Sequence, residues 1–292
     1  MNGVGRSVSF LSRGDQYKLA GTLYKATKPR TPSASILLSS ATAVKQTFYR
    51  HVAQKLASEG YDVLTYDYRG IGDSRPPTNL RGFDASMSDW AFKDMAGALD
   101  YIQEEIPTTD RLYMFGHSVG GQIAGLLPPE LASNIDGMVT VSSQSGYWKL
   151  QGGEQKITVC FHVHVTLPLL SYVVGYMPWS WFTNGAQDLP QNAALQWSKW
   201  CRSPKYILDD TSLPLSRYDN FTCPILAYSI EDDKWGTSKS VDSMMLSAYK
   251  NVERRHLDPK EYGLPVLGHF GYFREESENV WNDAIEWLNK QP

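Results

Sequence analysis

The sequence predicts an α/β fold in which a mostly parallel sheet is covered by helices on both faces. The first observation is an alternation of short β-rich runs with helical patterns, which continues to residue 142 and resumes at residue 224. The second is that one apolar run, residues 112–115, leads directly into Gly116-His117-Ser118-Val119-Gly120, after which a helical pattern begins. Strands that are each followed by a helix are what a parallel sheet requires.

The first two runs depart from this alternation. Residues 7–11 and 19–24 are separated by the turn-forming residues Arg13-Gly14-Asp15, which favour an antiparallel hairpin at the edge of the sheet. The remaining runs predict strands over 35–39, 62–66, 111–115, 137–142, 224–229 and 252–257. Helices are predicted from about Thr47, where Gly60 ends the helix, from about Ser88, over 122–127 before Pro128, from about Lys239, and at the carboxyl terminus.

The alternation fails between residues 143 and 214, a segment with five of the nine tryptophans. It is too long and too apolar for a plain loop, so we expect it to fold over the sheet. The sequence therefore predicts a core of residues 1–142 and 215–292, interrupted by an inserted cap or lid of residues 143–214.

One part of this insertion has the length of a membrane span. Residues 157–177 carry no Asp, Glu, Lys or Arg. Against a span, His162, His164 and Pro168 are costly in hydrocarbon, and no basic cluster flanks the segment. We expect a buried or lid element and no membrane span.

Composition narrows the function further. With 42% hydrophobic and 20% charged residues, the 292-residue chain is globular rather than disordered or collagenous. A net charge of −3 with interleaved signs gives no basic face for nucleic acid. Three scattered cysteines suit neither a disulfide framework nor a zinc site, and residues 1–10 contain no apolar signal core. We therefore expect a cytoplasmic protein.

The pentapeptide 116–120 has the pattern Gly-x-Ser-x-Gly in the strand-to-helix context that this motif requires. Glycines flank the serine because its backbone is held in a tight, strained turn, where neighbouring side chains would collide with the strand and the helix. Such a turn presents the hydroxyl at the carboxyl end of the sheet, where the helix behind it favours negative charge. Ser118 is therefore the predicted nucleophile.

A serine hydroxyl needs an adjacent base, and the base needs an orienting carboxylate. Of the six histidines, His269 lies in a glycine-flanked loop after the last predicted strand, so we predict it as the base. The acid is expected after the strand over 224–229, where Glu231-Asp232-Asp233 stands. Asp233 is the first choice and Asp232 the alternative.

These motifs occur in the order found in α/β-hydrolase-fold serine hydrolases, and the chain resembles that family over nearly its whole length. The resemblance is carried by Asp67-Tyr68-Arg69-Gly70-Ile71-Gly72-Asp73-Ser74, by the serine turn, by Glu231-Asp232-Asp233 and by Gly268-His269-Phe270. Residues 67–74, 144–148, 200–204 and 268–271 resemble, more narrowly, a subgroup of predicted hydrolases with poorly defined substrates. The resemblance implies an α/β-hydrolase fold with an inserted lid, and Ser118, Asp233 and His269 as a catalytic triad.

One loop departs from the family pattern. Many members carry His-Gly after the third strand, where this chain reads Ser39-Ser40-Ala41-Thr42-Ala43. Because this loop donates a backbone N–H to the oxyanion, its side chains can vary. We expect oxyanion donors from Val119 and from Ala41 or Thr42.

The remaining candidates concern substrate and cofactors. Lid aromatics shape pockets in such folds, so the predicted substrate contacts are His117, Trp148, Trp179 and Trp181. His162 and His164 lack the further ligands that a metal site needs, and the chemistry requires neither a metal nor an organic cofactor.

Together these residues predict a serine hydrolase that cleaves a carboxylic ester or related acyl bond, on a hydrophobic small molecule. The same triad could serve a thioesterase, an acyltransferase, a peptidase or a carbon–carbon bond hydrolase, because fold and triad do not fix the substrate. A ligand-binding receptor that retains the fold is the alternative from another class. The expected partner is a small acyl substrate, with a homodimer left open.

Overall fold

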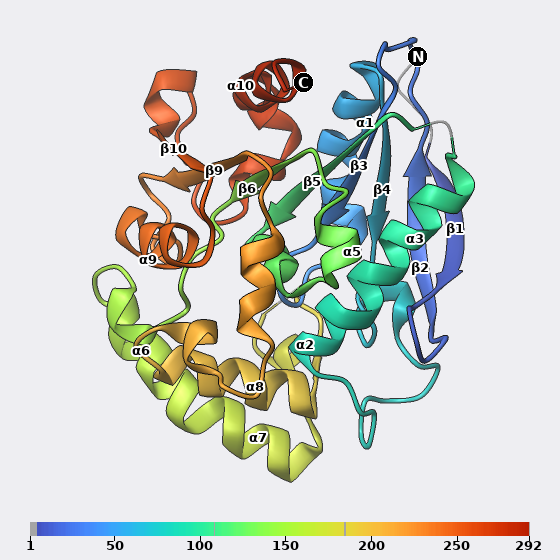
Figure 1. Cartoon of the computed structure of the whole chain (residues 1–292). Coiled ribbons are helices and arrows are strands. Elements are labelled where there is room, and N and C mark those ends of the chain that lie inside the picture. The colour runs from blue at the N-terminus through green and yellow to red at the C-terminus, as the bar shows by residue number, and fades with distance from the viewer. Residues whose placement is uncertain (1–4, 108, 184, 292) are drawn as a thin grey trace.

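An eight-stranded sheet runs through the computed structural model, which describes residues 5–107, 109–183 and 185–291 (Figure 1). In spatial order its strands are β1 (Arg6–Leu11), β2 (Lys18–Tyr24), β4 (Tyr61–Tyr66), β3 (Ala34–Ser39), β5 (Arg111–His117), β6 (Gly137–Val141), β9 (Ile225–Ile230) and β10 (Val252–Leu257). The pairs β1–β2 and β2–β4 are antiparallel and the others parallel. The predicted fold class and the edge hairpin are thereby confirmed. The first four residues of the amino-terminal segment 1–10 lie outside the described part.

The inner strands are continuous apolar runs because both of their faces are covered. In β3, Leu37 packs into one hydrophobic core while Ile36 and Leu38 pack into the other, as the two-residue period of a strand dictates. Helices α1 (Arg50–Ser58) and α10 (Glu278–Asn289) bury their apolar faces in the second core. Helices α3 (Ala96–Glu105) and α9 (Ser238–Ala248) bury theirs in the first.

Short helical pieces complete the core. Helix α2 (Met87–Asp89) continues through a π-helical turn, Trp90–Met95, into α3. The helix expected over 122–127 begins earlier, as α4 (Val119–Gln122), because β5 ends immediately before it, and tightens into a 3-10 turn ahead of Pro128. Helix α5 (Pro129–Ala132) follows. The other 3-10 turns are Gln46–Tyr49, Gly72–Ser74, Trp148–Leu150, Trp179–Trp181, Tyr206–Asp209, Leu215–Asn220, Pro259–Tyr262, Gly271–Phe273 and Glu275–Ser277.

Residues 143–214 contribute no described strand to the large sheet. Their main element is a continuous helix, residues 155–174, made of α6 (Gln155–Phe161), a π-helical turn (His162–Thr166) and α7 (Leu167–Val174). We call it the lid helix; it forms the lower edge of the molecule in Figure 1. A two-stranded ribbon of β7 (Tyr176–Met177) and β8 (Leu189–Pro190) leads to α8 (Gln191–Arg202), which lies between the lid helix and α2.

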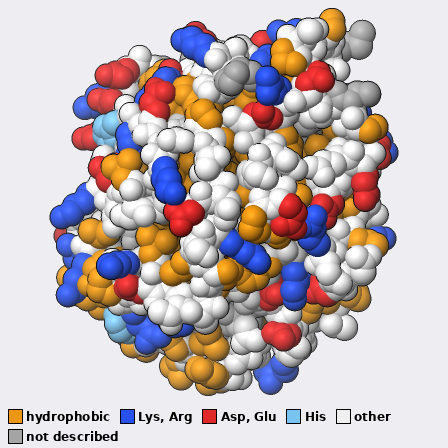
Figure 2. All heavy atoms as spheres, viewed as in Figure 1, with side chains coloured by type: hydrophobic (Ala, Val, Ile, Leu, Met, Phe, Trp, Pro, Cys, Tyr) orange, Lys and Arg blue, Asp and Glu red, His pale blue; other side chains and the backbone are white. Residues whose placement is uncertain are grey.

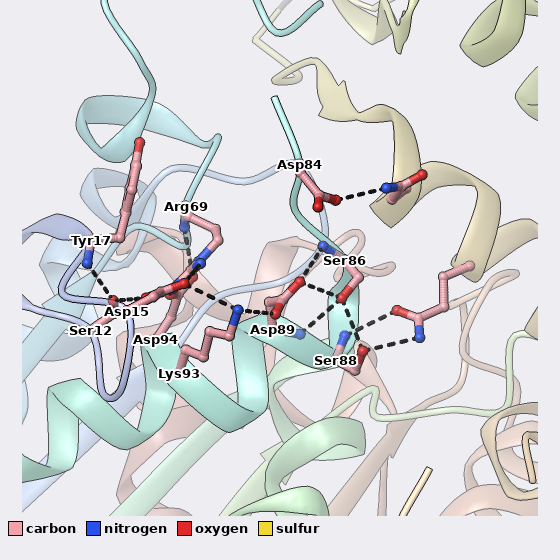
Figure 3. Close-up of polar contacts among 12 residues, drawn as sticks. Ser12, Asp15, Tyr17, Arg69, Asp84, Ser86, Ser88, Asp89, Lys93 and Asp94 are labelled. Atoms are coloured by element: carbon pink, nitrogen blue, oxygen red, sulfur yellow. Dashed lines mark hydrogen bonds and ion pairs between the residues drawn. The ribbon is translucent and has the colours of Figure 1, made fainter. Parts of the chain in front are cut away.

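Side-chain amides attach α8 to the core (Figure 3). Asn192 donates to Asp84 Oδ1 at 2.8 Å. Gln196 accepts from the Ser88 N–H at 3.0 Å and donates to the Ser88 hydroxyl at 3.1 Å. These three side-chain hydrogen bonds hold α8 in one register against the core.

The same view shows how the turn over 67–74 is fixed. The Arg69 Nε donates to Asp94 at 2.7 Å, and its Nη1 donates to Asp15 at 2.7 Å. Asp94 is fully buried, so its charge depends on Arg69 for compensation. Arg69 therefore joins the edge hairpin to the π-helical turn that precedes α3.

Candidate active site

Ser118 lies between β5 and α4 with φ 50° and ψ −116°, a conformation that a residue with a side chain rarely adopts. The flanking glycines make this turn possible. A Cβ on Gly116 would lie 2.5 Å from the Gly121 nitrogen, and one on Gly120 would lie 2.4 Å from the Ser39 carbonyl oxygen. The backbone segments touch directly at both places, so the turn has no room for larger residues.

His269 and Asp233 form a buried pair. The imidazole Nδ1 lies 2.8 Å from Asp233 Oδ2, while Asp233 Oδ1 accepts the N–H groups of Trp235 and Gly236, each at 2.8 Å. Burial by itself would raise the pKa of Asp233, but His269 and the Gly236 N–H stabilise the carboxylate and hold that pKa below its ordinary value. Asp233 is therefore ionised and fixes the proton of His269 on Nδ1.

Asp232, the alternative acid, has a different place. Its two carboxylate oxygens accept the N–H groups of Leu267 at 3.0 Å and Gly268 at 2.8 Å. Asp232 thus holds the backbone of the loop that carries His269, whereas Asp233 faces the imidazole itself.

The Ser118 hydroxyl lies 3.5 Å from Gln144 Oε1, to which it donates. In the described part of the chain no hydrogen bond joins Ser118 to His269, and in substrate-free enzymes such bonds are often long. Gln144 is fixed in turn by Gln122, whose Nε2 donates to the Gln144 carbonyl at 2.7 Å. Sequence reasoning missed Gln144 as a site residue. The available signal was its position directly after β6, the strand beside β5.

Of the two candidate oxyanion donors in the loop after β3, Ala41 is already engaged. Its N–H donates to the Tyr49 hydroxyl at 2.8 Å, which corrects the expectation that it is free for an oxyanion. The N–H groups of Thr42 and Val119 have no acceptor among the described residues. For Val119 this follows from its place in the first turn of α4. Thr42 and Val119 are therefore the pair available to a ligand.

The side chain of His117 is fully buried, so its expected contact with substrate is not supported. Its Nε2 lies 2.9 Å from the His269 carbonyl oxygen, which can only accept, so Nε2 carries the proton. Its Nδ1 then accepts from the Tyr49 hydroxyl at 2.8 Å. Burial is the main cause that lowers the pKa of His117 well below 6.5, so the ring is neutral. Tyr49 and His117 thus connect the loop of Ala41 to the loop of His269.

The predicted lid contacts are only half-buried or exposed. Trp148 and Trp179 pack edge-on against His164 and His162 of the lid helix, with ring centroids 6.0 and 5.9 Å apart. Trp181 is 64% exposed, so its expected role as a pocket wall is not supported. Both lid histidines bond to residues one turn away, and the described residues contain no cluster of metal ligands.

Comparison with known proteins places this geometry in a family. Residues 30–192, more than half of the chain, match the family model for serine aminopeptidase, S33. A soluble variant of monoglyceride lipase from Saccharomyces cerevisiae, solved with a substrate analogue, is 15% identical, with 98% of this chain and 95% of that chain covered and a TM-score of 0.67. An esterase from Pyrococcus furiosus is also 15% identical, over 99% and 93% of the two chains, with a TM-score of 0.59. So is a malate-bound esterase from Thermogutta terrifontis, over 98% of both chains and with a TM-score of 0.59.

Identities at this level reflect a common fold, and no curated protein matches the sequence. The family match extends from before β3, through Ser118, to the start of α8. The chain has the α/β-hydrolase fold and belongs to the serine aminopeptidase, S33 family of hydrolases.

Proposed function

We propose that the protein is a serine hydrolase that cleaves a carboxylic ester or a related acyl bond through an acyl-enzyme. The observation that carries the proposal is the buried, hydrogen-bonded His269–Asp233 pair next to a strained serine turn. The His269 ring lies 5.0 Å, centroid to centroid, from the ring of His117, the residue before Ser118. This short distance, measured at the residue next to Ser118, supports a triad of Ser118 as nucleophile, His269 as base and Asp233 as orienting acid.

In the first step, Ser118 Oγ forms a bond to the substrate carbonyl carbon while its proton moves to Nε2 of His269. Nε2 is available because Asp233 keeps the resting proton on Nδ1. The carbonyl π electrons move onto oxygen, and the oxyanion accepts the N–H groups of Val119 and Thr42. Each such donor stabilises the negative charge that develops in the transition state, by about 3 to 4 kcal/mol.

The tetrahedral intermediate then collapses. The bond to the leaving oxygen breaks, and that oxygen takes the proton from His269 Nε2. Water next attacks the acyl-enzyme and gives a proton to His269. The carboxylic acid leaves as Ser118 regains its proton. The cycle consumes one water and needs no other reagent.

The proposed substrate is a small molecule with an apolar acyl or aromatic group. Ser118 is 7% exposed, so the reacting bond is shielded from bulk water. The half-buried aromatic side chains Trp148 and Trp179 pack against the hydrophobic cluster that joins residues 143–214 to one side of the sheet. Gln144, beside the nucleophile, is neutral and polar, which suits an ester better than a charged group.

The test is labelling by a fluorophosphonate probe together with turnover of p-nitrophenyl esters of increasing chain length. Both should be lost in Ser118→Ala and retained in Ser133→Ala, a control at an exposed serine near α5. Acyl-CoA and aminoacyl amide substrates in the same panel separate the thioesterase and peptidase alternatives. Labelling that persists in Ser118→Ala contradicts the nucleophile, and ligand-induced thermal shifts without Ser118-dependent turnover would favour a receptor.

A further inference from the structure

Along its whole length the lid helix exposes large apolar side chains, beside the exposed polar residues Lys156, Thr158 and His164. Eight of the twelve exposed large hydrophobic side chains of the described chain lie on this helix or on the turn after β7, and most are spaced four residues apart. We call this set the lid face: Ile157, Phe161, Val165, Leu169, Tyr172, Val173, Trp181 and Phe182. In Figure 2, hydrophobic side chains gather at the lower edge of the molecule, where Figure 1 places α7.

The turn with Trp181 and Phe182 belongs to the same surface as the helix. Trp179 contacts the ring of His162 on the lid helix at 5.9 Å and the ring of Phe182 at 6.4 Å. The half-buried Trp179 therefore connects the turn of Phe182 to the lid helix. Contiguous exposed apolar patches of this kind mark binding surfaces.

The opposite face of the lid helix is committed to the protein. Val159, Val163 and Leu167 are buried, and the Ser198 hydroxyl of α8 donates to the Val163 carbonyl at 2.6 Å. Residues 155–174 are long and apolar enough to cross a membrane, with a mean hydropathy of 1.7. Crossing would strip this inner face from α8, which is itself attached to the core. The arrangement instead suits a helix that lies in the plane of a membrane surface.

Charges lie at the two ends of the lid face. Residues 157–177 contain no Asp, Glu, Lys or Arg. Lys149 and Lys156 lie at one end, and Arg81 lies at the other, beside Gly175. Among the described residues none of these three cations forms an ion pair. Lys149 lies over the Trp148 ring, 5.3 Å from its centroid, and Glu154 is close to both lysines in the sequence. Tyr172 and Trp181 are residue types that favour the boundary between headgroups and acyl chains.

The cations also decide between two occupants of the lid face. If a second copy packed antiparallel, its Arg81 would approach Lys149 and Lys156, and a parallel arrangement would bring lysine to lysine. Both place like charges together across an isologous contact. An anionic lipid surface neutralises all three cations while the apolar side chains enter the acyl boundary.

We propose that the lid face docks onto the surface of an anionic lipid bilayer. The apolar side chains of the lid face insert between the lipid headgroups, and Lys149, Lys156 and Arg81 approach lipid phosphates. This docking does not depend on the proposed hydrolase activity.

The test is co-sedimentation of the full chain with vesicles of phosphatidylcholine, with and without phosphatidylglycerol. The wild type should bind the anionic vesicles. The double variant Phe161→Glu/Leu169→Glu should bind at least about tenfold more weakly. It lacks two apolar side chains that, in the wild type, move from water into the bilayer. Leu246→Glu, at a 53%-exposed leucine on α9, is the matched control and should bind as the wild type does.

The charged part of the docking surface is tested separately. Lys149→Glu and Lys156→Glu should each weaken binding to anionic vesicles by about fivefold, with less effect on neutral ones. Ser118→Ala should bind as the wild type does, so loss of hydrolysis and loss of docking are read independently. Turnover of a short, soluble ester and the circular dichroism spectrum should be unchanged in the lid-face variants, which excludes misfolding.

Three results would overturn the proposal. The first is vesicle binding that the Phe161→Glu/Leu169→Glu variant does not weaken. The second is retention on membranes after alkaline carbonate extraction, which indicates a span. The third is a dimer in vesicle-free buffer that the same variant dissociates, combined with no binding of the wild type to vesicles.

Discussion

Helix α10 and the lid helix are surface helices whose outer faces differ in kind. Helix α10 buries Val280, Ile285 and Leu288 against the sheet and turns Glu278 and Glu286 to solvent. The lid helix also buries one side, yet its other side carries isoleucine, phenylalanine, valine and leucine. Both helices need an inner face that packs against the protein, so the difference between them lies in the exposed face. The charged face of α10 is suited to water, whereas that of the lid helix is suited to the apolar surface that we propose it binds. The same boundary separates the core, which carries Ser118, His269 and Asp233, from the insertion, which carries the lid face.

The strongest test of this division is Ser118→Ala. If the chemistry belongs to the core, kcat on p-nitrophenyl esters should fall by about 10⁶-fold, as in other enzymes that act through a serine triad. Thermal stability should stay near that of the wild type, since a small hydroxyl is lost from a preformed turn. Substantial residual turnover would mean that another residue, in the core or the insertion, acts as nucleophile.

A second test separates the two adjacent acids. Asp233→Asn should lower kcat by about 10⁴-fold, because the imidazole loses the acceptor that fixes its tautomer. Asp232→Asn should act mainly on stability, by about 1 to 3 kcal/mol, since it weakens the bonds to the Leu267 and Gly268 N–H groups. Steady-state kinetics and urea unfolding of both variants check this, and equal kcat losses would contradict the assignment.

The comparison of helices can be tested with one substitution at two sites. Ile285→Ala in α10 removes a side chain that is 6% exposed and should cost about 2 to 5 kcal/mol in the free energy of unfolding. Ile157→Ala in the lid helix removes one that is 75% exposed and should change that free energy by no more than about 0.5 kcal/mol. Urea unfolding in vesicle-free buffer measures both; similar costs would mean that the lid face is covered by protein.

Tyr49→Phe tests how the core positions its site. The variant leaves the Ala41 N–H and His117 Nδ1 without their common partner, at a cost of about 1 to 3 kcal/mol in stability. As a positioning residue, Tyr49 should affect kcat by about tenfold, with KM little changed. Tyr24→Phe, in the same hydrophobic core, is the control. A change confined to KM would instead place Tyr49 in substrate binding.

The smallest expected effect is a pH dependence set by His117. In the unfolded chain this ring takes up a proton near its ordinary pKa of 6.5, whereas in the fold its pKa is lower because it is buried. The unfolded state therefore binds more protons below 6.5, and stability should fall as pH decreases, by up to about 1.4 kcal/mol per pH unit. His117→Gln should flatten this part of the profile; an unchanged slope would show that the ring can be protonated in place.

The predictable features of this molecule are those with a local signature. Two-residue periods and turn residues predicted the sheet and its hairpin, and the glycines of 116–120 predicted the serine turn. Helix α10 lies at the carboxyl terminus, where a helix was predicted, and polar residues mark its outer side. The lid helix carries large apolar residues on both its buried and its exposed sides, so periodicity could not orient it.

Other features depend on the path of the backbone. Asp232 and Asp233 are neighbours in sequence, and only the loop that carries His269 decides which one meets the imidazole. Tyr49 lies between β3 and β4, whereas His117 ends β5. The Tyr49 hydroxyl that donates to His117 also accepts the Ala41 N–H. No pattern in the sequence encodes these long-range contacts, so sequence reasoning could not foresee that Ala41 and His117 would have Tyr49 as a common partner.

The close approach of Gly120 to Ser39 has a consequence for how such a protein diversifies. A Cβ on Gly120 would lie 2.4 Å from the Ser39 carbonyl oxygen, so α4 can approach the end of β3 this closely only with glycine at this position. Gln144, beside Ser118, belongs to the segment 143–214, but neither Gly120 nor Ser39 does. We therefore expect substitutions within residues 145–214 to leave this backbone contact unchanged.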